Sequence, residues 1–183
     1  MVPVVPSPLP CGGRDRSHVA VFDLTAAERP GRIEEARVRF LEFYGSHMVD
    51  ETYTYPGVEA TLRHFSSLGK RMAVVTNKPE GLAEGILKEL GLRSVFGMVV
   101  GGDTVVNKKP HPEPIELVLK GFGVDRPMAL FVGDSAIDAA TGKEAGVYTV
   151  GVSYGFGGGG AAVRDAGFDL VIDGFSELKG LID

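Results

Sequence analysis

Short apolar runs alternate with amphipathic stretches from residue 57 to the end of the chain. The apolar runs predict strands at 72–75, 97–100, 128–132, 147–152 and 169–172. Apolar positions at helical spacing predict helices at 57–68, 80–90, 113–122 and 136–145. This alternation is typical of a parallel, doubly wound sheet, so we expect an α/β fold with a Rossmann-type sheet between two layers of helices.

The first part of the chain follows a different pattern. Residues 1–17 are rich in Pro and Gly, and we expect them to be disordered. The apolar run Val19–Phe22 predicts a short strand, and 32–47 carries apolar residues at helical spacing. Residues 49–55 are expected to be a connector. We therefore predict a disordered start followed by one α/β domain.

Two carboxylates follow the predicted strand 128–132. Gly133 and Asp134 come directly after it, and Asp138 stands four residues beyond Asp134. Open α/β sheets bind ligands at the carboxyl ends of their strands, and a helix starting after Asp134 would turn both carboxylates into one crevice. Such a pair suits a hard cation such as Mg²⁺. The alternative is ordinary helix capping by Asp134 or Ser135.

Polar groups also follow two other predicted strands. Thr76 and Asn77 come after 72–75, and Lys109 follows 97–100 at a short distance along the chain. A hydroxyl and an amide can donate hydrogen bonds to phosphoryl oxygens, and a lysine neutralises phosphoryl charge as a point cation. The three strand ends together predict a phosphate pocket with a metal on its far side.

The sequence resembles the haloacid dehalogenase (HAD) superfamily of phosphohydrolases in the order Thr76-Asn77, Lys109-Pro110 and Gly133-Asp134-x-x-x-Asp138. The segments 55–58, 75–79, 101–104, 109–112 and 154–155 resemble its phosphoglycolate phosphatase-like branch. The resemblance implies a three-layer HAD-like core with a reduced or truncated helical cap. It also implies a Mg²⁺-dependent phosphomonoester hydrolase that acts on a small phosphorylated metabolite, with phosphoglycolate as the first expectation.

The same resemblance implies roles for individual residues. Thr76 would bind the phosphoryl group, with Asn77 beside it. Lys109 would steady the nucleophile and the transferring phosphoryl group. Asp134 would coordinate Mg²⁺, and Asp138 would complete or orient that metal shell.

The motif that starts the family is missing from this sequence. The first strand of the family ends in Asp-x-Asp-Gly-Thr, in which the first Asp is the nucleophile and the second is the general acid and base. No Asp-x-Asp occurs in this chain. Val19–Phe22 opens like that strand and leads to Asp23, the candidate nucleophile, but Thr25 stands in place of the second Asp. Without the acid, a loss of about 10²–10⁴-fold in rate is expected.

A second interpretation of this segment stays open, and it is the one we prefer from the sequence. Residues 24–30 and the amphipathic run 33–44 resemble the last part of the family's cap, which would make Asp23 only a helix-start residue. The chain would then be a catalytically impaired or incomplete HAD-fold protein that only binds phosphate and Mg²⁺. A phosphoryl-transfer mutase of the same fold would also need the missing second Asp.

These interpretations lead to one domain prediction and one structural prediction. We expect 1–17 to be disordered and 18–183 to form the HAD-like core, with 26–50 as the cap remnant.

In the family the first strand lies between the strands that carry Thr76 and Asp134. If residues 19–22 do not fill that place, the sheet has a gap with unpaired backbone groups.

Composition and charge limit the size of the core, the kinds of partner and the cellular setting that we expect for this chain. A chain of 183 residues can bury a core of one domain. Its net charge of −5 argues against a nucleic-acid partner, which needs a basic face. No apolar run approaches the ~20 residues of a membrane span, so no membrane partner is expected. Its single cysteine, Cys11, excludes an internal disulfide. Because disulfides are typical of oxidising compartments, we expect a cytoplasmic setting. The oligomeric state does not follow from the sequence.

Overall fold

A computed structural model describes residues 4–5, 31, 35, 53–155 and 159–182 of the chain. The chain divides into two units, Met1–Val5 with Tyr53–Asp183 and Pro6–Thr52. In the second unit the described residues are Gly31 and Glu35, and both are helical.

Several predictions for the first part of the chain lie outside the described residues. The strand at Val19–Phe22 and the candidate nucleophile Asp23 are among them. So is the cap remnant at 26–50, apart from the two helical residues of the second unit. The domain layout therefore stays a prediction.

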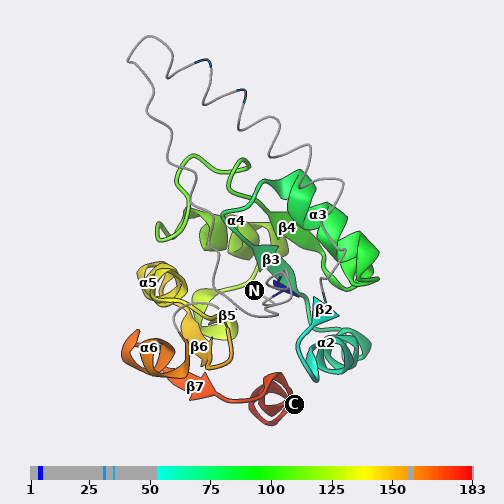
Figure 1. The fold of residues 1–183 in the computed structure, drawn as a ribbon, viewed down its shortest axis with the longest axis vertical. Coiled ribbons are helices and arrows are strands. Elements are labelled where there is room, and N and C mark those ends of the chain that lie inside the picture. Colours follow the sequence, from blue (N-terminus) through cyan, green and yellow to red (C-terminus); the bar gives the residue numbers. More distant parts are fainter. Residues whose placement is uncertain (1–3, 6–30, 32–34, 36–52, 156–158, 183) are drawn as a thin grey trace, which may run out of the picture. The chain divides into compact units, whose positions relative to one another are not determined.

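The described strands and helices alternate along the chain (Figure 1). The strands are β1 (Val4–Val5), β2 (Tyr53–Thr54), β3 (Ala73–Val75), β4 (Met98–Val100), β5 (Leu130–Gly133), β6 (Tyr148–Val152) and β7 (Leu170–Ile172). The α-helices are α2 (Val58–Ser67), α3 (Glu80–Glu89), α4 (Glu113–Phe122), α5 (Ala136–Ala145), α6 (Gly159–Asp165) and α7 (Lys179–Ile182). Three 3₁₀ helices are η1 (Arg93–Val95), η2 (Arg126–Met128) and η3 (Phe175–Leu178).

The parallel strands form two separate sheets. β3 pairs with β4 in one, and β5, β6 and β7 form the other in that order. Within the described residues, no strand pairing joins β3 to β5, although the two strands face each other between the sheets in Figure 1. The predicted α/β fold with parallel strands is therefore confirmed.

Two apolar cores cover the two faces of these strands. Val74 of β3 and Val132 of β5 belong to one core, which also contains Leu62 of α2. Their chain neighbours Val75 and Phe131 belong to the other core, together with residues of α4 and α5. Figure 1 shows α2 and α3 on one side of the strands and α4, α5 and α6 on the other. The three-layer arrangement follows from this alternation of buried side chains.

The element bounds differ from the sequence predictions at a few places. Helices α4 and α5 match their predicted bounds, but the strand predicted at 128–132 begins at Leu130. Met128 ends η2 instead, because its N–H donates to the Asp125 carbonyl, and it is 82% exposed. Val4–Val5 lies in the stretch predicted to be disordered, yet it pairs with Tyr53–Thr54 of the predicted connector.

None of the helices in the described ranges combines the length and the apolar composition that crossing a membrane needs.

Candidate active site

A buried ion pair lies at the carboxyl edge of β5. Lys109 comes from the loop between β4 and α4, and Asp138 lies in the first turn of α5. The Lys109 Nζ atom is 2.6 Å from Asp138 Oδ1, and the two side chains are only 8% and 3% exposed. The structure therefore brings two predicted site residues together and removes both charges from water.

The second oxygen of Asp138 is engaged as well. Asp138 Oδ2 accepts a hydrogen bond from the Ser135 hydroxyl at 2.7 Å and from the Asp134 N–H at 3.2 Å. Ser135 in turn caps α5 by accepting from the Asp138 N–H, so the capping alternative holds for Ser135. Burial raises the pKa of Asp138, but the Lys109 ammonium and these donors outweigh it and hold the pKa below its ordinary value. Asp138 is therefore an ionised partner of Lys109 near neutral pH.

Two glycines let the site aspartates approach the backbone. A Cβ atom on Gly133 would lie 2.2 Å from Asp138 Cβ. A Cβ atom on Gly155 would lie 2.1 Å from Asp134 Cβ. Both distances are far below van der Waals contact, so any side chain at these positions would displace a carboxylate. Gly155 is a site residue that the sequence reasoning missed, and the Tyr154-Gly155 match to the family branch was the signal that pointed to it.

Asp134 follows β5 directly and shares its surroundings with two tyrosines. The rings of Tyr55 and Tyr154 pack edge to face with centroids 4.6 Å apart. Burial raises the pKa of Tyr154, and the nearby Tyr55 and Asp134 raise it further, so its hydroxyl stays protonated. That hydroxyl is buried and has no hydrogen-bond partner among the described residues. A neutral O–H donor thus lies near the Asp134 carboxylate.

Asn77 holds the backbone of Lys109. The Asn77 amide nitrogen donates to the Lys109 carbonyl at 3.0 Å, and the Lys109 N–H donates to Asn77 Oδ1 at 3.0 Å. Both ends of the side-chain amide are therefore bound to the loop that carries the lysine. The predicted place of Asn77 beside the phosphoryl group is untested, but its observed contacts position Lys109.

Thr76 ends β3 with its hydroxyl in a defined orientation. The Thr76 N–H donates to the Val100 carbonyl at 2.9 Å and continues the pairing with β4. Thr76 Oγ1 accepts a hydrogen bond from the Lys78 N–H at 3.1 Å. The Lys78 N–H thus occupies one lone pair of this oxygen. The Thr76 O–H can still donate a hydrogen bond to a ligand.

The loop that presents Lys109 is held by a residue that the sequence reasoning missed. Glu113, the first residue of α4, accepts hydrogen bonds from the Val106 N–H at 2.9 Å and the Asn107 N–H at 3.0 Å. The Glu113 N–H donates to His111 Nδ1 at 3.2 Å. These hydrogen bonds join residues six and seven positions apart in the loop before α4, and no pattern in the sequence indicated them.

A metal would have few protein ligands among the residues described. They contain no group of three or more His, Cys, Asp or Glu side chains that could hold a metal ion. Both oxygens of Asp138 have partners. Asp134 follows β5 directly and brings a second carboxylate to this edge of the sheet. Mg²⁺ commonly binds one or two carboxylates and completes its shell with phosphate oxygens and water. Asp134 therefore fits a magnesium ion that arrives with a phosphorylated ligand.

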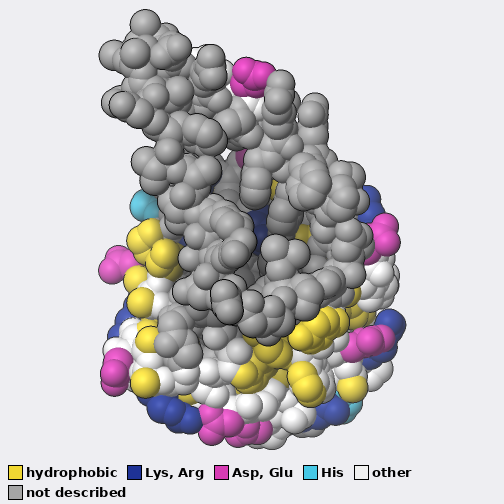
Figure 2. All heavy atoms as spheres, in the orientation of Figure 1, with side chains coloured by type: hydrophobic (Ala, Val, Ile, Leu, Met, Phe, Trp, Pro, Cys, Tyr) yellow, Lys and Arg dark blue, Asp and Glu magenta, His cyan; other side chains and the backbone are white. Residues whose placement is uncertain are grey.

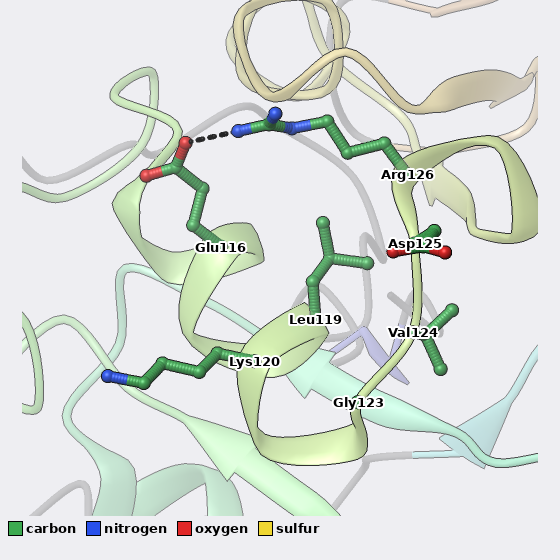
Figure 3. Close-up of a pocket in the computed structure, with 7 residues that line it drawn as sticks. All are labelled: Glu116, Leu119, Lys120, Gly123, Val124, Asp125 and Arg126. Carbon is green, nitrogen blue, oxygen red and sulfur yellow. Dashed lines mark hydrogen bonds and ion pairs between the residues drawn. The ribbon is translucent and has the colours of Figure 1, made fainter.

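A hollow lies away from this edge, near the end of α4 (Figure 3). It encloses about 350 Å³, and Arg126 reaches across it to Glu116, with 3.0 Å between Nη2 and Oε1. Lys120 points away from the hollow in the same view. The Arg126–Glu116 pair is largely exposed, so this hollow lacks the buried cation of the first site.

The fold and the site define an α/β protein that carries charged groups at the carboxyl edge of a parallel sheet. Residues 23–152 match the family described as haloacid dehalogenase-like hydrolase. The chain belongs to this family.

Individual relatives carry a more specific name. The phosphoglycolate phosphatase of Pectobacterium atrosepticum is 38% identical over 151 residues, which cover 82% of this chain and 64% of the relative. That of Rhodospirillum rubrum is 42% identical over 140 residues, which cover 76% of this chain and 57% of the relative. A crystal structure of a predicted phosphoglycolate phosphatase from Haemophilus somnus superposes with a TM-score of 0.79 at 30% identity, covering 88% of this chain and 69% of that one. The chain thus spans less than two thirds of the length of the first two relatives.

Proposed function

We propose that this chain is a Mg²⁺-dependent phosphomonoester hydrolase of the phosphoglycolate phosphatase type, acting on a small phosphorylated metabolite. Phosphoglycolate is the first candidate, because the relatives at 38% and 42% identity carry that name. The observation that carries the proposal is the buried pair of Lys109 and Asp138, 2.6 Å apart at the end of β5.

Stability alone is a poor reason for such a pair. Two charges taken out of water are costly, and apolar residues of similar size often stabilise a fold as well or better. Here the lysine also has its backbone held by Asn77 and its loop held by Glu113. A cation placed in this way, with little freedom to reorganise, suits an anionic group that gains charge during reaction.

Each residue of the site has a distinct task in this proposal. Lys109 neutralises phosphoryl charge, and Asp138 keeps the ammonium group in place. The Thr76 hydroxyl donates a hydrogen bond to a phosphoryl oxygen. Asp134 holds Mg²⁺, and the bound ion supplies positive charge to the phosphoryl oxygens.

The nucleophile is the remaining part of the proposal. A carboxylate such as Asp23 would attack phosphorus to form an acyl phosphate and release the alcohol, and water would then cleave that intermediate. Thr25 can neither protonate the leaving alkoxide nor deprotonate the water near neutral pH. We therefore expect slow turnover.

A second candidate function is favoured by the sequence itself. Since no Asp-x-Asp occurs in the chain, it would bind phosphate and Mg²⁺ through Thr76, Lys109 and Asp134 without catalysing hydrolysis. The two candidates share the binding site and differ in whether phosphate is released.

The test measures binding and turnover on the same preparations. Inorganic phosphate binding is followed by calorimetry, and phosphate release from p-nitrophenyl phosphate and phosphoglycolate is followed with and without Mg²⁺. Lys109→Met should lose both signals, whereas Lys120→Met, an exposed lysine of α4, should keep them. Binding without release would favour the second candidate, and equal phosphate affinity in Lys109→Met and the parent would contradict both.

The metal has a separate test. Asp134→Ala should lose the heat of Mg²⁺ binding in the presence of phosphate, whereas Asp125→Ala, an exposed carboxylate near η2, should not. Equal Mg²⁺ binding in Asp134→Ala and the parent would remove Asp134 from the metal site.

A further inference from the structure

Three residues that follow β4 have no task in the site described above. Gly101, Gly102 and Asp103 form the loop that leaves this strand, and both glycines are buried whereas Asp103 is exposed. Helix α3 lies against β4 (Figure 1), and the loop contacts the first residue of that helix. The segment 76–79 leads from β3 into α3 and includes Thr76. The loop after β4 therefore adjoins residues that we propose to bind phosphate.

Helix α3 takes its N-terminal cap from this loop. Its N-cap residue is Pro79, which makes no side-chain cap hydrogen bond. The N–H of Glu80, the first residue of α3, donates instead to Asp103 Oδ1 at 2.7 Å, although the two residues are 23 positions apart in the chain. The first N–H groups of a helix have no partner within it, and a carboxylate there is a strong acceptor that also suits the positive end of the helix dipole. Asp103 therefore joins the start of α3 to the end of β4.

The two glycines bring the backbone of this loop against the segment after β3. The Gly102 N–H donates to the Lys78 carbonyl at 2.8 Å. A Cβ atom on Gly102 would lie 2.4 Å from the Asn77 carbonyl oxygen, and one on Gly101 would lie 2.3 Å from the Glu80 nitrogen. Both distances are far below van der Waals contact, so only glycine lets the two backbones come this close. The loop and the segment therefore form one hydrogen-bonded unit.

This unit holds the two polar side chains that follow β3. Thr76 Oγ1 accepts a hydrogen bond from the Lys78 N–H, and the Lys78 carbonyl is bound by Gly102. Asn77 exchanges two hydrogen bonds with the backbone of Lys109. A shift of the segment would therefore displace the Thr76 hydroxyl and the Lys109 ammonium group together.

The position of these few groups matters because the surface charge is mixed. Figure 2 shows Lys and Arg side chains interspersed with Asp and Glu side chains among the described residues of that face. The whole chain carries a net charge of −5. Since such a distribution gives no general attraction for anions, phosphate affinity has to come from individual groups that are held in place.

We propose that Asp103 is a positioning residue of the phosphate site, and that Gly101 and Gly102 give it access to the start of α3. Its carboxylate fixes the first residue of the helix, and thereby the orientation of Thr76 and the place of Lys109. The proposal rests on the phosphate site proposed above and adds a residue that acts through others. The alternative is a plain helix cap, which would change the stability of the chain and leave its affinity for phosphate unchanged.

Amide hydrogen exchange tests the hydrogen bond itself. Asp103 is exposed, so Asp103→Ala leaves no cavity in the core. The Glu80 amide should exchange at least about tenfold faster in Asp103→Ala than in the parent, because the first amide of a helix has no acceptor within it. Asp103→Asn keeps an acceptor oxygen and should retain most of the protection. Equal exchange of the Glu80 amide in the parent and in Asp103→Ala would overturn the proposal.

Calorimetry with inorganic phosphate tests the positioning role. Asp103→Ala should bind phosphate about tenfold more weakly than the parent, because the groups that hold the anion are displaced, and Asp103→Asn should restore most of the affinity. The matched control is Asp169→Ala, whose carboxylate also accepts a backbone N–H, that of Thr149 near the amino end of β6, at 2.7 Å. This control loses a hydrogen bond of the same kind and should keep the affinity. An equal loss of affinity in Asp169→Ala would overturn the proposal.

The parent chain separates a failure of this proposal from a failure of the phosphate site. A parent that binds no phosphate would overturn the proposed function and the positioning role with it. A parent that binds phosphate no more tightly than Asp103→Ala would overturn the positioning role alone.

A pair of glycine variants gives an independent result, and it decides if Asp103→Ala does not fold. Gly102→Ala should weaken phosphate binding, because its methyl group displaces the Asn77 carbonyl. Gly81→Ala in α3 should keep the affinity, because its methyl group meets no atom within 4 Å. Equal phosphate affinity in the two glycine variants would overturn the proposal.

Discussion

Lys109 Nζ and Asp138 Oδ1 lie 2.6 Å apart although the two residues are 29 positions apart in the chain. This contact makes Asp138 the buried partner of the lysine. Asp134, the other carboxylate of the 134–138 motif, is the cation ligand that we propose. The predictions below follow from these two assignments and from the contacts around them.

Removing the carboxylate of Asp138 should destabilise the fold strongly. Asp138→Asn leaves the buried Lys109 without its ion-pair partner, and losses of about 3 kcal/mol or more are usual in such cases. Urea denaturation measures the change. The matched control is Glu116→Gln, which removes one side of an exposed pair with Arg126 and should change stability by less than about 1 kcal/mol. Similar small effects in both variants would show that the buried pair is not a stabilising contact.

The same pair predicts a pH dependence in the acid range. The pKa of Asp138 is lower in the folded chain than the ordinary value of about 3.9 for an unfolded Asp. Its contribution to stability is therefore complete above that value and is lost as pH falls through the folded pKa. The difference in unfolding free energy between the parent and Asp138→Asn should shrink as pH falls below about 4. Other acidic groups occur in both chains and cancel in this difference, so a constant difference down to low pH would contradict the assignment.

Asn77 should affect the site through the position of Lys109. Asn77→Ala removes two hydrogen bonds to the Lys109 backbone, and we expect a loss of about 1–2 kcal/mol in stability. Phosphate affinity should fall about tenfold, because a misplaced cation binds the anion less well. Ser67→Ala serves as the control, since that hydroxyl donates a hydrogen bond to the His64 carbonyl within α2. If Asn77→Ala weakens phosphate binding no more than the control does, Asn77 is not a positioning residue.

Gly155 should tolerate no side chain. The methyl group of Gly155→Ala would lie 2.1 Å from Asp134 Cβ, which cannot move without its backbone. We expect weaker Mg²⁺ binding in the presence of phosphate, measured by calorimetry. Gly160→Ala is the matched control, because the nearest atom to its new methyl group is 3.5 Å away. Normal Mg²⁺ affinity in Gly155→Ala would mean that the position of Asp134 does not determine metal binding.

The missing acid predicts a gain of function. If Asp23 is the nucleophile, Thr25→Asp should raise phosphatase turnover by about 10²-fold or more, because it supplies a general acid and base. Asp23→Asn should abolish turnover. Steady-state phosphate release measures both variants. If both match the parent, Asp23 is not at the active site and the truncated-cap interpretation of 24–44 stands.

The sequence alone determined the alternation of strands and helices from β3 to β6 and most of their bounds to within one residue, because the spacing of apolar residues is a local property. Helices α6 and α7 were not predicted. Helices α4 and α5 occupy the predicted positions, and Thr76 and Asp134 directly follow their strands. The strand start at Leu130 was missed, since a 3₁₀ turn at 126–128 and a strand both accept the apolar Met128. The ordered motifs also predicted the family, which the comparisons show.

Only the tertiary structure decided how the site residues are paired. Lys109 and Asp138 meet because the loop after β4 folds across the end of β5, and no spacing in the sequence encodes that distance. The contacts of Asn77 with the Lys109 backbone and the close approach of Gly155 to Asp134 likewise depend on segments far apart in the chain. Whether residues 19–22 lie between the strands that carry Thr76 and Asp134 stays a prediction, because these residues lie outside the described ranges. Local patterns determine which elements form, whereas packing between distant elements determines which side chains share a site.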